Sequence, residues 1–69
     1  MLRQSVSSSN LASVGYDALT HTLEIEFLNG SVYQYSGVPS TVFQGLMGAA
    51  SHGTYFNAYI KNVYSYRRI

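Results

Sequence analysis

The chain has 69 residues, which is enough for one domain whose single hydrophobic core is only marginally stable. It has no cysteine, so disulfides and thiolate metal sites are excluded. Charged residues make up 10% of the chain, against about 25% in globular domains, and the net charge is +1. This excludes a strongly basic surface and favours self-association, so we expect a tendency to form homo-oligomers.

No apolar run approaches the roughly 18 residues needed to cross a bilayer. The N-terminal residues include one Arg but no apolar stretch after it, so they do not resemble a secretion signal. We expect a cytoplasmic protein without a membrane partner. The chain is interpreted as one domain, residues 1–69, in which residues 1–9 form a flexible, serine-rich arm.

Three segments predict strands. The first is Ala12–Asp17, where Val14 and Tyr16 alternate with smaller residues, and Asp17 begins a turn. The segments 22–27 and 31–35 alternate in the same way on either side of Asn29-Gly30, a typical hairpin turn. The sequence therefore predicts a three-stranded antiparallel meander.

Two registers of the hairpin are open. A two-residue turn would place Tyr33 and Tyr35 opposite the two glutamates, outside the core. A three-residue turn with Gly30 in the left-handed region would instead pair Ile25 with Tyr33. The second register gathers the large apolar side chains on one face, so we favour it. In the first register the two tyrosines would form an exposed binding platform.

Two helices are predicted after Pro39, which suits the first turn of a helix. The first spans residues 40–50. The second is predicted over Thr54–Val63, with Phe56, Ile60 and Val63 on one stripe and Ser51 as its cap. The expected fold is thus α+β, with the meander followed by two short helices packed on one face, in the order β-β-β-α-α.

Residues capable of acid–base chemistry are few and scattered. Glu24 and Glu26 lie two apart on one strand and could form a carboxylate pair, but such a pair is more typical of a solvated sheet face. Adjacent Ser51 and His52 cannot form a dyad by local geometry. We therefore expect no catalytic residues, no metal ligands and no cofactor.

Aromatic and basic residues gather near the C-terminus, as nucleic-acid binding requires. The alternative is that these tyrosines fill the core while the arginines keep the end of the chain soluble. The candidate binding residues are Tyr55, Tyr59, Lys61, Tyr64, Tyr66, Arg67 and Arg68.

The whole pattern resembles the KTSC domain, a small domain found at the C-terminus of some lysyl-tRNA synthetases and alone in bacteria and bacteriophages. The resemblance covers nearly the whole chain. It rests on the order and spacing of residues 8–10, 14–17, 23–27, 29–30, 33–35, 38–39, 50–53, 55–57, 60 and 64–66.

The resemblance implies a one-domain α+β fold and a link to RNA or tRNA, without an established reaction. Two classes of function follow. The first is a non-catalytic domain that contacts RNA through its C-terminal Tyr, Lys and Arg residues. The alternative is a module for protein interaction or self-assembly, such as a phage or bacterial protein that binds a host factor.

Overall fold

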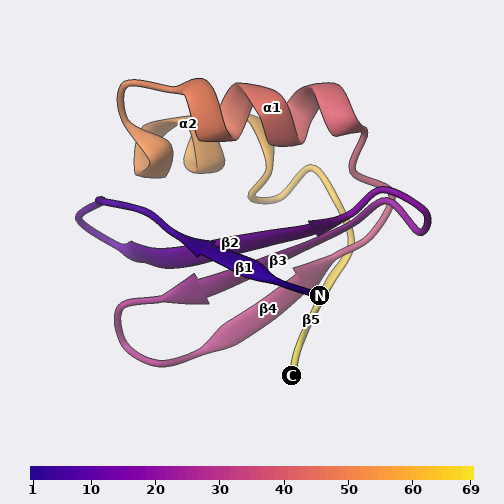
Figure 1. The fold of residues 1–69 in the computed structure, drawn as a ribbon, viewed down its shortest axis with the longest axis horizontal. Helices are drawn as coiled ribbons and strands as arrows, with labels where there is room; N and C mark the ends of the chain where they lie inside the picture. The colour runs from indigo at the N-terminus through magenta and orange to yellow at the C-terminus, as the bar shows by residue number, and fades with distance from the viewer.

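The computed structural model describes all residues, 1–69, as a five-stranded antiparallel sheet with two helices on one of its faces (Figure 1). The class is α+β, as predicted. The elements are β1 (Arg3–Ser5), β2 (Leu11–Asp17), β3 (Thr22–Phe27), β4 (Val32–Tyr35), α1 (Ser40–Gly48), α2 (His52–Tyr59) and β5 (Tyr66–Arg68).

The strands lie side by side in the order β1-β2-β3-β4-β5. The predicted meander forms the centre of this sheet, but the prediction of three strands was wrong, because a three-residue strand is added at each edge. Every residue of both added strands is exposed, so neither strand carries the alternation of buried and exposed residues that identifies a strand in a sequence. β1 falls within the residues assigned to the N-terminal arm, where Gln4 pairs with Val14.

The hairpin adopts the favoured register. Ile25 lies opposite Tyr33, and Leu23 lies opposite Tyr35. The turn is closed by the Phe27 N–H, which donates to the Ser31 carbonyl over 2.9 Å. Gly30 has φ +91°, the left-handed conformation that this turn requires. Leu23, Ile25, Tyr33 and Tyr35 therefore share the face that the helices cover.

The core lies between this face of the sheet and the two helices. Its fully buried side chains come from β2, β3, α1 and the segments that follow β4 and α2: Leu11, Val14, Leu23, Ile25, Val38, Leu46 and Ile60. The ring of Tyr16 stacks on Phe43 of α1, with centroids 4.7 Å apart. Its hydroxyl also donates to the Val38 carbonyl over 2.5 Å. These two contacts fix α1 over the sheet.

α2 is shifted from the predicted helix. Ser51 caps it as expected, because its hydroxyl accepts from the Thr54 N–H over 3.2 Å. The predicted end at Val63 was wrong, since the helix stops at Tyr59 and Asn62 takes a positive φ of 64°. Val63 is consequently 59% exposed rather than part of the core, while Phe56 and Ile60 are buried as predicted.

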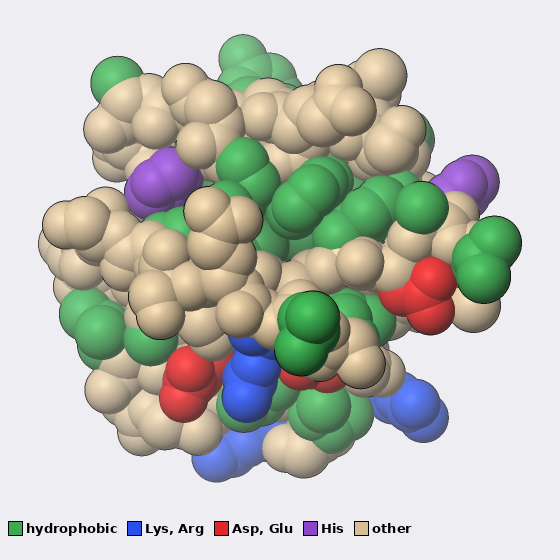
Figure 2. Space-filling model, in the orientation of Figure 1, with side chains coloured by type: hydrophobic (Ala, Val, Ile, Leu, Met, Phe, Trp, Pro, Cys, Tyr) green, Lys and Arg blue, Asp and Glu red, His purple; other side chains and the backbone are tan.

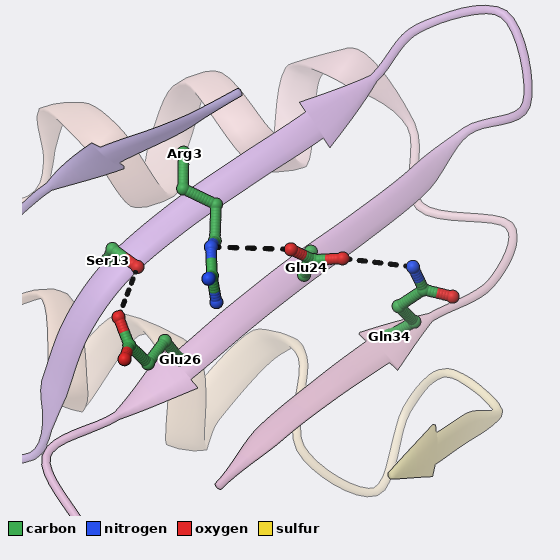
Figure 3. Close-up of polar contacts among 5 residues, drawn as sticks. All are labelled: Arg3, Ser13, Glu24, Glu26 and Gln34. Carbon is green, nitrogen blue, oxygen red and sulfur yellow. Dashed lines mark hydrogen bonds and ion pairs between the residues drawn. The ribbon is translucent and has the colours of Figure 1, made fainter. Parts of the chain in front are cut away.

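The other face of the sheet carries a polar row. Arg3, Gly15, Glu24, Gln34 and Arg67 are neighbours in register, one from each strand. The side chain of Arg3 crosses β2 to reach Glu24, with 3.4 Å between Nε and Oε2 (Figure 3). A Cβ at residue 15 would lie 2.9 Å from Cγ of Arg3, so glycine leaves the space for this crossing.

The assignment of faces can be tested by truncating one residue on each. Ile25→Ala removes a fully buried side chain, and we expect it to lower the free energy of unfolding by about 2–5 kcal/mol, or to unfold this small domain. Val32→Ala, on the polar face of the adjoining strand, should cost about 1 kcal/mol or less. Urea denaturation measures both, and equal costs would contradict the assignment.

The pH dependence of the free energy of unfolding tests the burial of Tyr35. Burial, reinforced by the neighbouring hydroxyls of Tyr33 and Tyr66, raises the pKa of Tyr35 from 10.0 to about 12. The folded state therefore keeps this proton over a range where the unfolded chain loses it. The stability that Tyr35 contributes is complete below pH 10 and is lost as pH rises towards 12.

We expect the free energy of unfolding of the wild type to fall relative to that of Tyr35→Phe as pH increases from about 10 to 12. Urea denaturation at several pH values measures the difference. Below pH 10 the difference should be constant, and a constant difference through the whole range would mean that Tyr35 titrates as a solvated tyrosine.

Candidate ligand-binding cleft

A cleft of about 300 Å³ opens between α2, the β3–β4 turn and the strands β4 and β5. Its walls come from parts of the chain that are far apart in sequence. The lining residues are Asn10, Phe27, Asn29, Ser31, Tyr33, Tyr35, Phe56, Asn57, Lys61, Asn62 and Tyr66.

Aromatic rings form one side of the cleft. Phe27 meets Tyr33 edge-to-face at 5.7 Å, and Phe56 meets Tyr35 in the same way at 5.5 Å. Tyr66 lies 5.6 Å from both Tyr33 and Tyr35, yet 58% of it is exposed. Tyrosine and phenylalanine side chains carry no charge at neutral pH, so the aromatic side of the cleft is uncharged. It offers π-faces on which a planar ring can stack.

Amide groups form the rest of the lining. All four asparagines of the chain lie here, one each from the segment before β2, the β3–β4 turn, α2 and the segment after it. Their amides can donate and accept hydrogen bonds. Lys61 is the one charged residue among the lining side chains, which include no carboxylate and no histidine. The cleft is therefore suited to a ligand with a polar edge and a negative charge.

Gly53 brings α2 against the loop that carries Asn10. Gly53 is buried, and a Cβ at this position would overlap Oδ1 of Asn10. Asn10 is held from the other direction by Leu28, whose N–H donates to its carbonyl over 2.9 Å. The absent side chain at residue 53 thus allows helix, loop and turn to meet around the cleft.

The candidate binding residues from the sequence do not all lie on one surface of the molecule. Lys61 and Tyr66 line the cleft, and Arg68 pairs with Tyr33, on the same face of the sheet. Arg67 lies on the opposite face, where its guanidinium donates to Gln34 Oε1 over 3.4 Å. The adjacent arginines therefore belong to different surfaces.

The remaining three tyrosines lie away from the cleft lining. Tyr55 and Tyr59 contact each other on α2, with ring centroids 4.7 Å apart, and Tyr59 is 58% exposed. Tyr64 is half-buried and packs against the core.

Sequence reasoning missed the asparagines and Ser31. The sequence assigns Asn29 to a hairpin turn, and nothing local relates it to Asn10 or Asn57. It predicts a binding platform of the β4 tyrosines only in the register that the structure does not adopt. The sequence did contain one indication of the site. All four asparagines lie in or next to the turns and the second helix.

The glutamates of β3 are engaged on the polar face, away from the cleft. Glu24 Oε1 accepts from the Gln34 amide over 2.9 Å, and Glu26 Oε1 accepts from the Ser13 hydroxyl over 2.8 Å (Figure 3).

No group of three or more His, Cys, Asp and Glu side chains is placed to hold a metal ion. None of the helices has the length and apolarity required to cross a membrane.

Charge is distributed unevenly over the molecule. Apart from His52, the segment from Pro39 to Ile60, which contains both helices, has no acidic or basic residue. Figure 2 shows the Lys and Arg side chains below the helices, towards the sheet. The Lys and Arg side chains that could attract an anionic ligand therefore lie on the sheet and the C-terminal segment, and none lies on the helices.

Comparison with known proteins identifies the fold family. Residues 7–64 match the model of the KTSC domain. A KTSC domain protein from Yersinia pestis has a crystal structure that superposes with a TM-score of 0.94 at 45% identity, covering 99% of this chain and 96% of that one.

Two relatives differ greatly in length. A protein of Stutzerimonas stutzeri (strain A1501) is 44% identical over 70 residues, which span 100% of this chain and 99% of that protein. A lysine–tRNA ligase of Trichormus variabilis (strain ATCC 29413 / PCC 7937) is 44% identical over 54 residues, which are 78% of this chain but 10% of the ligase. The similarity to the ligase is thus limited to one small segment of it. The family match and the full-length relatives together show that the chain belongs to the KTSC domain family.

Proposed function

We propose that this KTSC domain is a non-catalytic module that binds single-stranded RNA through the cleft beside α2. The observation that carries the proposal is the convergence of aromatic rings, all four asparagines and Lys61 on one opening. Such a lining matches an unpaired nucleotide, which has a planar ring, a polar edge and a phosphate. The lining lacks the carboxylates and histidines that commonly act as general acids and bases.

Tyr66 supplies the exposed stacking surface. Its ring is held by contacts to Tyr33 and Tyr35 on its sheet side, while more than half of it remains accessible. Stacking of a base on an aromatic side chain contributes roughly 1–3 kcal/mol. Because any base has a π-face, this contact favours unpaired nucleic acid without selecting a sequence.

Lys61 and Arg68 supply the charge on this face. With only two cations, we expect weak affinity that falls as salt is added, by about 0.7 in the logarithmic slope for each phosphate neutralised on a single strand. The lysine–tRNA ligases that contain a matching segment add support for an RNA ligand.

A second candidate function is protein binding through the helices. The exposed Tyr59 lies on a helical surface without acidic or basic residues other than His52. Tyrosine is enriched in interface hot spots. Binding to such a surface would change little with salt, whereas RNA binding would weaken steeply.

The two adjacent arginines allow a matched test of the RNA proposal. Arg68→Ala should weaken binding to a fluorescein-labelled, unstructured RNA and reduce the salt slope by about 0.7. Arg67→Ala removes the same charge from the opposite face and should leave both quantities nearly unchanged. Fluorescence anisotropy over a salt series measures them, and equal effects of the two variants would place the RNA elsewhere.

The stacking contact has its own matched pair. Tyr66→Ala should weaken RNA binding by roughly 1–3 kcal/mol, with the salt slope retained. Tyr59→Ala removes an equally exposed tyrosine from α2 and should have no effect on RNA. If Tyr59→Ala were the damaging variant, the ligand would bind on the helices. Amide spectra of both variants check that the fold is intact.

A further inference from the structure

Two asparagines of the cleft have their oxygen atoms committed inside the protein. In the β3–β4 turn, Oδ1 of Asn29 accepts from the N–H of Ser31 over 3.0 Å and from its hydroxyl over 2.6 Å. A backbone N–H can only donate, so the atom facing it must be the amide oxygen. Both lone pairs of this oxygen are used, which leaves Asn29 only its NH₂ group for a ligand.

Asn10 is fixed by a similar argument. The hydroxyl oxygen of Ser8 accepts from the N–H groups of Asn10 and Leu11, each over 3.3 Å. Its single proton is directed to Asn10 Oδ1 over 3.1 Å, so the Asn10 amide also has a set orientation. Its NH₂ group is the part without an internal partner.

Ser31 adds an acceptor to the same lining. Its hydroxyl proton is given to Asn29, so its oxygen can only accept from a ligand. The side chains of Asn57 and Asn62 make no hydrogen bonds within the protein and can present either end of the amide. The part of the cleft with a fixed polarity therefore consists of two NH₂ donors and one hydroxyl acceptor.

We infer that the cleft selects uracil over cytosine, an inference that rests on the proposed RNA-binding function. Uracil presents two carbonyl acceptors on either side of one N–H donor, which complements two donors and an acceptor. Cytosine has nearly the same shape but replaces one carbonyl with an amino donor. That donor would face an NH₂ group of Asn10 or Asn29 and leave both unpaired.

The inference is tested by comparing the binding of a uridine octamer with that of a cytidine octamer, at neutral pH and low salt. These probes have the same charge and nearly the same size, so stacking and phosphate contacts are matched. We expect uridine to bind about tenfold more tightly, which is within the discrimination that one well-placed base contact provides. Fluorescence anisotropy gives the affinities, and amide chemical shifts locate the site.

Asn29→Asp tests the role of the fixed amide. The carboxylate retains an oxygen for both Ser31 donors and replaces the free NH₂ group with a second acceptor, which suits the amino group of cytosine. We expect the preference for uridine to be lost or reversed. Asn62→Asp adds the same charge to the lining at an amide without a fixed orientation, and should weaken both octamers equally.

Asn10→Asp is the second variant, because the hydroxyl of Ser8 still has its acceptor there. If either fixed amide acts as inferred, its variant narrows the ratio of the two affinities while Asn62→Asp preserves it. Equal binding of the two octamers by the wild type, with shifts at the cleft, would overturn the uracil inference and leave the proposed function standing. Absence of binding to both would overturn the two together.

Discussion

The turn between β3 and β4 determines which face of the sheet carries the aromatic side chains of the core and the cleft. Its closure by Phe27 and Ser31, with Gly30 in the left-handed region, sets the register of every residue in the hairpin. A shift by one residue would exchange the aromatic and polar faces. The same turn places Asn29 and Ser31 beside those rings. A single local geometry thus produces both the core and the polar edge of the cleft.

The cleft depends on long-range packing as much as on the turn. Its polar groups come from loops and from α2, and each is brought in by a contact that looks structural when taken alone. Gly53 admits Asn10, Phe56 packs on Tyr35, and the strand pairing of β5 places Tyr66 over the hairpin. Each of these contacts therefore both stabilises the fold and places a group at the cleft.

Local patterns were sufficient to predict the central meander, the hairpin register and the cap at Ser51, since alternation, turn chemistry and capping act over a few residues. They could not predict β1 and β5, because these strands pair with the free edges of β2 and β4, carry no alternation of their own and, in the case of β5, lie far along the chain from the partner strand. For the same reason the sequence grouped Arg67 with Arg68, which only the strand register separates. Lys61 and Tyr66 were predicted from composition, but the asparagines meet only in the folded chain.

The outer strands also affect how copies of this protein meet. Of the four Lys and Arg residues in the chain, three lie in β1 and β5, at Arg3, Arg67 and Arg68. An exposed strand edge is a template for further β-pairing, and short strands with positive charge discourage such growth. A chain with so few charges thus places most of its cations where intermolecular sheet extension and aggregation would begin.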